Sequence, residues 1–197
     1  MKALVYDIEI VKAIPEHDGN NELGIDYCAG WRDHGNMGIS VIGAYDYETD
    51  RYRVFCKDNF GLFLDATTGK LLVGFNSIAF DNAVINATLG VTIPEDHCYD
   101  LLRETWAAFG LGQVFNYKTH GGFSLDAICK RNFGIKKTGN GALAPKLWQR
   151  GEIGAVIDYC LNDVAMTKTF FDHVISGKVI KKDGLSSFLR VPECGEM

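Results

Sequence analysis

The stretch KALVYDIEI, at residues 2–10, places two acids at the end of a hydrophobic run. Residues 3–6 are all apolar, which is typical of a strand that is buried on both faces. Because side chains alternate along a strand, Asp7 and Glu9 would point the same way, with Cα atoms about 6.5–7 Å apart. Two anions at the edge of a core repel each other and lose hydration, so they require a cation or a proton. The stretch therefore predicts a site for a hard divalent metal ion.

The alternative is that the strand stops at Tyr6 and that both acids are solvated. An Asp-x-Glu tripeptide occurs by chance in a chain of ordinary composition. This chain repeats it at Asp46-Tyr47-Glu48, in a segment with the features of a hairpin turn. The tripeptide alone does not decide between the two interpretations.

The composition is that of a globular protein with one core. The chain has 197 residues, of which 47% are hydrophobic and 23% charged, and this predicts a single domain. The net charge of −5 gives no overall basic surface, but carboxylates gathered around a metal would contribute to that sum. The cysteines form no CxxC pair, and the chain has neither a signal-peptide pattern nor a long apolar run. We therefore expect reduced thiols in a cytoplasmic protein that is not inserted in a membrane.

The first half of the chain combines loops with β-rich runs. Residues 11–36 lack a clean period and predict a long loop, of a kind that is often functional beside a site. Residues 37–46 and 51–57 predict an antiparallel hairpin next to the first strand. A short helix is expected at 60–65 and a short buried strand at 71–74. A helix at about 80–89, ended by Gly90, would place Asp81 in its first turn.

The second half is mainly helical. A short strand is expected at 97–101, where Asp100 caps the next helix, and Ser124 caps another that Gly134 closes. A Gly- and Lys-rich connection follows, and then an apolar stripe at helical spacing from about 152 to 175. Tyr159 and Asp163 lie one turn apart at the rim of that stripe, where the helix would meet the sheet edge.

Strands that first form a hairpin and then alternate with helices predict an α/β protein. We expect a mixed central sheet flanked by helices in a three-layer fold. Residues 178–182 and 185–189 predict a C-terminal hairpin around Asp183-Gly184. Residues 1–177 would form the body of one domain, to which 178–197 add this hairpin and a tail.

Three short motifs occur in order along the chain: Asp7-Ile8-Glu9, NSIAFD at 76–81 and YCLND at 159–163. In these motifs the chain resembles the DEDD superfamily of 3′-to-5′ exonucleases, which has a ribonuclease H-like fold. The match runs from residue 2 to about 174. Position 158, where the other branch of the superfamily has His, is Asp158, so the resemblance is to the tyrosine branch, DEDDy. It is strongest to exonucleases related to the proofreading domain of family-B DNA polymerases, although the long 11–36 loop and the lack of a polymerase or helicase region are departures.

The resemblance implies a role for each motif residue. Asp7, Glu9 and Asp163 would hold one divalent cation beside the attacking water, and Asp7 would bridge to a second cation that Asp81 supports. Two Mg²⁺ or Mn²⁺ ions can hold the attacking and leaving oxygens of a phosphodiester during displacement. Tyr159 has an ordinary pKa of about 10 and is a poor base at neutral pH, so we assign it to orienting the water.

The second motif also supplies Asn76 and Phe80, which the resemblance assigns to substrate binding. Taken singly, each motif residue has an ordinary explanation, such as a first-turn acid for Asp81 or a rim aromatic for Tyr159. Their ordered occurrence favours the catalytic interpretation. Three other acids have no motif to support them and are left out of the site: Asp100, Asp126 and Glu152.

The expected function is that of a stand-alone, metal-dependent 3′-to-5′ exonuclease that releases nucleoside monophosphates. Its partner would be a single-stranded 3′ end; DNA is favoured over RNA, but the sequence does not separate the two. The alternative is a module with the same fold that binds nucleic-acid ends without cutting them. Loss of one acid, the usual signature of such a module, is not seen.

Residues 130–150 are basic and contain no acid. They hold six of the chain's 20 basic residues: Lys130, Arg131, Lys136, Lys137, Lys146 and Arg150. Such a run is either a solvated surface or a phosphate-tracking loop, in which glycines 134, 139 and 141 would allow close backbone approach. Its position between the second and third motifs favours the loop. Lys136 or Lys137 is the expected phosphate contact, and the sequence does not choose between them.

Overall fold

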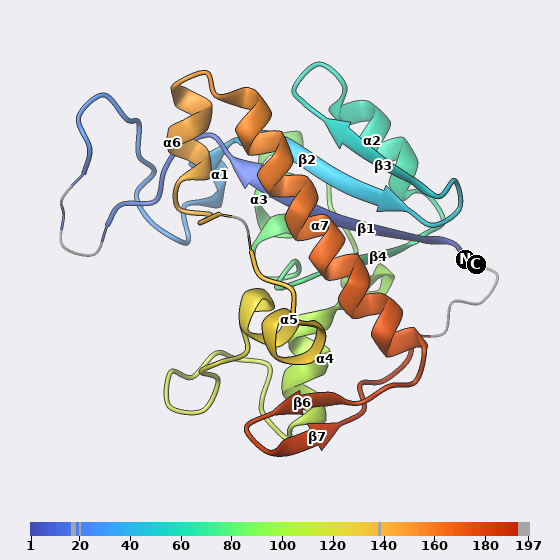
Figure 1. Cartoon of the computed structure of the whole chain (residues 1–197). Helices are drawn as coiled ribbons and strands as arrows, with labels where there is room; N and C mark the ends of the chain where they lie inside the picture. The colour runs from blue at the N-terminus through green and yellow to red at the C-terminus, as the bar shows by residue number, and fades with distance from the viewer. Residues whose placement is uncertain (17–18, 20, 138, 193–197) are drawn as a thin grey trace.

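The computed structural model of the protein describes residues 1–16, 19, 21–137 and 139–192 (Figure 1). Five strands form a mixed sheet in the order β3-β2-β1-β4-β5, so the predicted α/β class and mixed sheet are confirmed. β1 runs antiparallel to β2 and parallel to β4, while β2 and β3 form the predicted hairpin. The strands are β1 (Ala3–Ile10), β2 (Ile39–Asp46), β3 (Arg51–Phe55), β4 (Leu71–Gly74) and β5 (Cys98–Asp100).

The described residues form seven α-helices and a 3₁₀ helix at Glu95–His97. The α-helices are α1 (His34–Met37), α2 (Phe60–Thr67), α3 (Asp81–Leu89), α4 (Leu101–Ala108), α5 (Leu125–Phe133), α6 (Ala144–Gln149) and α7 (Ile153–Ile175). The sequence does not predict two of them: α1 covers the end of the expected 11–36 loop and the first residue of the expected 37–46 strand, and α6 falls in the Gly- and Lys-rich connection. Both are too short to show a helical period, although α6 has Pro145 in its first turn, where proline is favourable.

The predicted helix ends are confirmed. The Asp100 side chain accepts hydrogen bonds from the N–H groups of Leu102 and Arg103, and Ser124 accepts one from Ala127. Gly90 and Gly134 close α3 and α5 in the left-handed conformation that glycine adopts without strain. These caps fix where the chain changes direction.

Helices cover both faces of the sheet, with α4, α5 and α7 on one face and α2 and α3 on the other (Figure 1). The alternation of β1 explains this arrangement, because Ala3 and Val5 pack toward α7 while Leu4 and Tyr6 pack toward α2 and α3. Asp7 and Glu9 continue the row of Ala3 and Val5. The strand therefore presents its acids to the α7 face.

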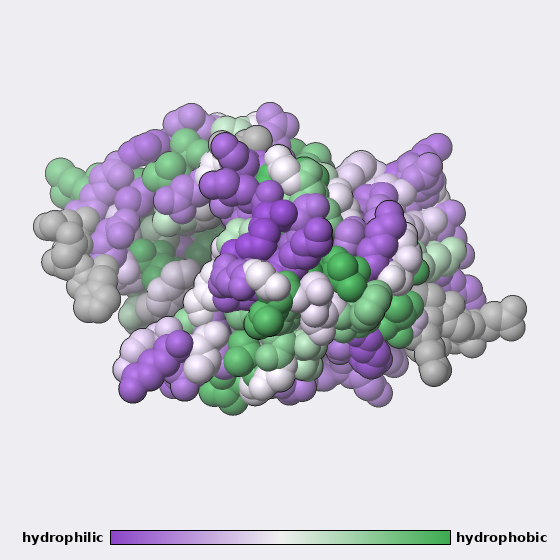
Figure 2. Space-filling model, turned by 60° about the horizontal axis from the view of Figure 1, so that its bottom comes forward, coloured by the Kyte–Doolittle hydropathy of each residue, from purple (hydrophilic) through white to green (hydrophobic). Residues whose placement is uncertain are grey.

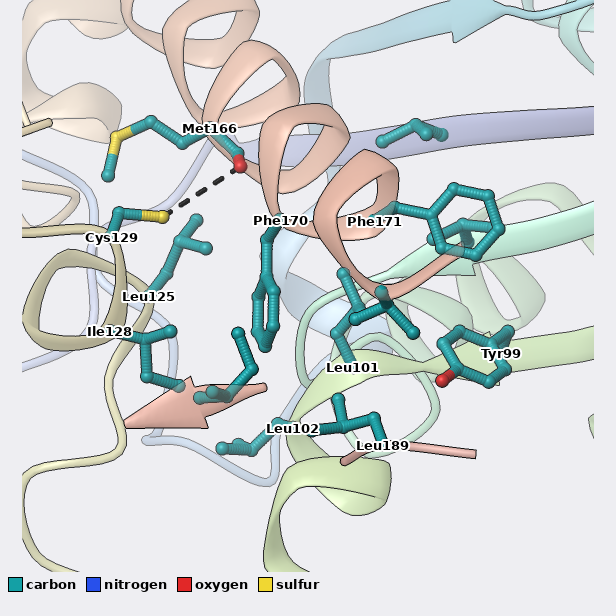
Figure 3. Packing of buried hydrophobic residues seen from close by; sticks show 14 of the residues in the cluster. Tyr99, Leu101, Leu102, Leu125, Ile128, Cys129, Met166, Phe170, Phe171 and Leu189 are labelled. Carbon is teal, nitrogen blue, oxygen red and sulfur yellow. Dashed lines mark hydrogen bonds between the residues drawn. The ribbon is translucent and has the colours of Figure 1, made fainter. Parts of the chain in front are cut away.

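The core on the α7 face is filled by side chains from three helices and the sheet. Figure 3 shows Phe170 of α7 pointing between α4 and α5, and Phe171 lying against Tyr99 of β5, with ring centroids 5.6 Å apart. The Cys129 thiol donates to the backbone oxygen of Met166 over 3.8 Å. Because α7 is anchored by these contacts along its second half, its first half is held in a fixed position over β1.

The α7 helix packs tightly against the sheet at Gly43 of β2, which pairs with Asp7. A Cβ atom on Gly43 would lie only 2.9 Å from Cys160 Sγ and 3.2 Å from a methyl group of Val164. Glycine is required here because α7 occupies the space of a side chain. The same contact sets the height of Tyr159 and Asp163 above Asp7.

The C-terminal hairpin is also confirmed, as β6 (Ile180–Lys182) and β7 (Leu185–Ser187). Asp183 and Gly184 connect the two strands with φ angles of 48° and 81°, as expected for a tight two-residue turn. The end of the predicted tail, residues 193–197 with Cys194, lies outside the described residues. The other five cysteines are free thiols, as expected.

Among the described residues, no helix combines the length and the hydrophobicity needed to cross a membrane.

The contact at Gly43 predicts a sharp effect of one methyl group. Gly43→Ala should lower the free energy of unfolding by about 1–3 kcal/mol, because the added carbon overpacks the interface between β2 and α7. Urea denaturation would measure this, with Gly61→Ala as control, since a Cβ on Gly61 of α2 meets nothing within 4 Å. Adding Cys160→Ala should recover part of the loss. Equal effects of the two glycine substitutions would show that α7 does not approach β2 this closely.

Candidate metal centre

The first two acids lie within β1, past the point where one of its neighbouring strands ends. β4 pairs with β1 only from Ala3 to Val5, whereas β2 continues alongside to Ile10. Glu9 is only 6% exposed, so the interpretation in which the strand stops at Tyr6 and its acids are solvated is wrong. The pairing shifts register between Glu9 and Ile10, an irregularity that is common beside active sites.

The Asp81 side chain approaches β1 beside Ile8, where β4 has ended and no longer pairs with β1. The chain leaves β4 at Gly74, turns through Asn76 with a φ of 62°, and begins α3 at Asp81. There Asp81 Oδ1 accepts a hydrogen bond of 3.2 Å from the N–H of Ile8, a group that β4 no longer pairs. The buried carboxylate of Asp100 accepts bonds from the N–H groups of Asn76 (2.9 Å) and Ile78 (3.1 Å) and so holds this turn.

The last two predicted residues come from α7. Tyr159 and Asp163 lie one turn apart, as predicted, and both are buried. Lys137 binds them together, because its Nζ donates to Asp163 Oδ2 and, over 3.0 Å, to the Tyr159 hydroxyl. The other oxygen of Asp163, Oδ1, is buried and has no hydrogen-bond partner among the described residues.

All five predicted residues line one cavity of about 650 Å³, which we call the acidic cavity: Asp7, Glu9, Asp81, Tyr159 and Asp163. Burial raises the pKa of Asp7 and of Glu9 well above the usual range, and the neighbouring carboxylates raise both further. Burial likewise raises the pKa of Asp81 to about 7, although the hydrogen bond from Ile8 opposes the shift. At neutral pH these groups resist ionising together unless positive charge is supplied.

Lys137 supplies part of that charge. Burial lowers its pKa, but the charge of Asp163 and the hydrogen bonds outweigh this effect, so the pKa of Lys137 is raised and the side chain stays cationic. Burial raises the pKa of Tyr159, which therefore stays protonated. Because Lys137 donates to the Tyr159 oxygen, the hydroxyl proton is left to point toward another acceptor.

Cys160 is a member of the cluster that the sequence did not suggest. One ligand atom each from Asp7, Glu9 and Cys160 lie within 4.8 Å of one another. The Cys160 thiol donates to the backbone oxygen of Asp7 over 3.4 Å, and burial raises its pKa well above the ordinary value. A protonated, buried thiol is a poor ligand for a hard cation, so Cys160 supports the position of Asp7.

The residues present fit divalent cations such as Mg²⁺ or Mn²⁺. The donor set consists of carboxylate oxygens, which these ions prefer, and they are held by rigid elements. The unpartnered Oδ1 of Asp163 is an acceptor that the described protein groups leave unsatisfied. A cation would satisfy this oxygen and relieve the repulsion that raises the carboxyl pKa values.

A second, larger cavity adjoins the first and shares Asp7, Asn76, Lys137, Tyr159 and Asp163 with it. Its volume is about 1080 Å³, and we call it the aromatic cavity because its wall includes Trp31, Phe75, Trp106, Phe115 and Phe123. Figure 2 shows a recess in the surface with hydrophobic residues inside it and hydrophilic residues along its border. Of the predicted substrate-binding residues, Asn76 lines both cavities, Phe80 the acidic one and Lys136 the aromatic one.

The long 11–36 loop contributes a residue that was not predicted, Trp31. Its ring is 70% exposed yet lines both cavities, and it contacts Phe80 with ring centroids 6.0 Å apart. The loop is fastened to α6, because Lys146 and Arg150 form ion pairs with Glu22 and Lys146 also pairs with Glu16. An unusually long loop was the only sequence signal for this contribution.

The basic side chains of segment 130–150 have three uses, of which one is the ion pair of Arg131 with Asp183. Lys130, Lys136 and Lys137 line the aromatic cavity, whereas Lys146 and Arg150 pair with the 11–36 loop. The glycines were predicted to approach phosphate, and the structure gives them other uses. Gly134 ends α5, while Cβ atoms on Gly139 and Gly141 would lie 2.8 Å and 3.3 Å from atoms of Tyr159. Thr138, in the middle of this segment, lies outside the described residues.

Comparison of the sequence with models of known protein families gives no match. A comparison with curated proteins gives no match either. The motifs and the geometry of the cavities are therefore the basis for assigning a function.

The raised carboxyl pKa values predict how stability changes with pH. A carboxyl group whose pKa is higher in the folded than in the unfolded protein stabilises the fold while protonated. This contribution is complete below about pH 4 and is lost as the pH rises through the folded value, about 7 for Asp81. Asp81→Asn keeps an acceptor for Ile8 but cannot ionise. In chelator, the variant should therefore lose less thermal stability than the unaltered protein between pH 5 and pH 8.

Adding Mg²⁺ or Mn²⁺ at pH 8 should favour the unaltered protein over Asp81→Asn in melting temperature, because a ligand that binds only the folded state stabilises it. The unaltered protein should gain melting temperature, and Asp81→Asn should gain less. Differential scanning fluorimetry in chelator and in metal measures both effects. The same pH slope for the two proteins in chelator would contradict the raised pKa of Asp81.

Proposed function

We propose that the protein is a metal-dependent 3′-to-5′ exonuclease of the DEDDy type with a ribonuclease H-like fold. It hydrolyses the terminal phosphodiester bond of a single-stranded nucleic acid, DNA rather than RNA, and releases a nucleoside monophosphate. The observation that carries this proposal is the convergence of four carboxyl groups and the Tyr159 hydroxyl on one cavity. They come from three separate parts of the chain, in the order and spacing of the three motifs.

Each residue has a task that its surroundings support. Asp7, Glu9, Asp81 and Asp163 would hold two divalent cations, which supply charge neutralisation and activation of water when bound. Tyr159 stays protonated and receives a hydrogen bond from Lys137, so it orients the attacking water rather than removing its proton. Lys137 is cationic beside Asp163 and lines both cavities, which suits a contact with the phosphate that is cleaved.

The sequence left open a module that binds nucleic-acid ends without cutting. Such a module has no need for a cluster of four carboxyl groups, in three of which, Asp7, Glu9 and Asp81, burial and neighbouring carboxylates raise the pKa. Carboxylates that face the same cavity would also repel a phosphate backbone in the absence of metal. The arrangement therefore favours cleavage.

The first test is a nuclease assay on 3′-labelled and 5′-labelled single strands of DNA and RNA, with Mg²⁺, Mn²⁺ or chelator. Asp163→Asn should lower turnover by at least about 10²-fold, the scale of removing one charged group from a catalytic site, and should reduce the stabilisation by metal. The matched control is Asp158→Asn, an exposed acid on the same helix, which should keep full activity. Cleavage in excess chelator, or full activity of Asp163→Asn, would contradict the proposal.

The second test concerns one oxygen atom. Tyr159→Phe keeps the ring that packs against Gly139 and loses only the hydroxyl. We expect kcat to fall on the order of 10²–10³ while KM changes little, because the hydroxyl acts mainly in the transition state. The pH profile of single-turnover rates should keep its shape, since Tyr159 orients water without ionising. Loss of one limb of that profile would instead make Tyr159 a general base.

A further inference from the structure

The wall of the aromatic cavity contains an exposed aromatic side chain that the proposed chemistry does not use. Phe115 lies in the connection between α4 and α5 and is 64% exposed, yet it lines the same cavity as Asp7 and Asp163. Behind it are Trp106 of α4 and His120, whose ring centroids lie 6.4 Å and 5.9 Å from that of Phe115. The exposed ring of Phe115 therefore offers an apolar contact to a molecule bound in this cavity.

This connection is held in one shape by His120. The ring is buried and interacts through Nε2 with the backbone oxygen of Gly112, 2.8 Å away, and through Nδ1 with the Thr119 hydroxyl, 2.8 Å away. The N–H of Asn116 also donates to Nδ1 over 3.3 Å. Because the segment on both sides of Phe115 is fixed in this way, the ring is presented to the cavity at little further entropic cost on binding.

A second feature of this cavity is a buried donor in its wall. Trp106 is only 6% exposed and lines the cavity, and its indole N–H has no hydrogen-bond partner among the described residues. A buried donor without a partner costs free energy, and a shift of the cavity wall on binding would let a base or phosphate oxygen satisfy it. Lys130 and Lys136 line the same space and provide positive charge.

The size of the cavity favours a polymer. About 1080 Å³ exceeds the roughly 300–1,000 Å³ of pockets that hold one small molecule, and the acidic cavity adjoins it. Aromatic rings beside basic side chains form the usual platform for single-stranded nucleic acid, in which bases stack and phosphates contact cations.

We infer that the aromatic cavity binds a stretch of single-stranded substrate, and that Phe115, supported by Trp106, stacks on a nucleobase at least one nucleotide away from the bond that is cleaved. This inference rests on the proposed function and adds a specificity for length: the protein prefers strands of several nucleotides to dinucleotides. Stacking tolerates any base, so Phe115 contributes little base preference.

The test uses fluorescein-labelled oligothymidylates of two, four and eight nucleotides. Binding is measured by anisotropy in chelator, and kcat/KM in Mg²⁺ or Mn²⁺. Phe115→Ala should weaken binding of the octamer, and lower kcat/KM for it, by roughly 5- to 150-fold, the range that corresponds to stacking of one base. The dinucleotide should be affected less than about twofold, and Phe115→Trp should restore the preference for length.

The matched control is Tyr117→Ala. Tyr117 lies in the same connection and is 77% exposed, but it is not part of the wall of the aromatic cavity. The inference would be overturned if Phe115→Ala and Tyr117→Ala had equal effects on the octamer, or if Phe115→Ala affected the dinucleotide as much as the octamer. Cleavage by the unaltered protein would still uphold the proposed function in either case. If the unaltered protein cleaved no oligonucleotide with either metal, the proposed function would fail and the inference with it.

Discussion

Electrostatic repulsion between buried carboxyl groups is the constraint on which this structure depends. Asp7, Glu9, Asp81 and Asp163 line one cavity, and Lys137 is the cationic side chain that the described residues place against them. A chain free to relax would separate these groups. Here they are held together by elements that pack elsewhere: β1 by its neighbouring strands, α3 by its core contacts, and α7 by the aromatic cluster around Phe170. The stability of the two cores thus maintains an arrangement that is locally unfavourable without positive charge.

Two features of the backbone bring the groups together. The early end of β4 leaves the N–H of Ile8 without a strand partner, and Asp81 accepts its hydrogen bond. The lack of a side chain at Gly43 lets α7 descend until Cys160 meets the backbone oxygen of Asp7. One feature acts at an edge of β1 and the other at its face. Together they explain why residues separated by most of the chain's length converge at the end of a single strand.

The sequence predicted the scaffold well because its signals are local. Alternation in β1, the caps at Asp100 and Ser124 and the apolar stripe of α7 each depend on a few neighbouring residues, and the structure has all of them. The four acids were identified because each falls at the end or rim of such an element. What could not be predicted depends on distant contacts. Cys160 had the pattern of a core residue, Trp31 lay in a segment without periodicity, and the glycines near Tyr159 had no visible partner. The contact of Lys137 with Asp163 also required the fold, because the sequence did not distinguish Lys137 from Lys136.

The ion pairs between α6 and the 11–36 loop have a consequence for the way binding would be quantified. Lys146 and Arg150 meet Glu16 and Glu22 at a partly exposed surface, so dissolved salt screens these pairs. The loop they fasten carries Trp31, which forms part of the wall of both cavities. Salt also weakens nucleic-acid binding directly, because counterions released from neutralised phosphates must return. In the proposed nuclease the two effects would act in the same direction. The slope of log affinity against log salt concentration would therefore set an upper limit on the number of phosphates contacted, since part of that slope reports the loosening of the loop.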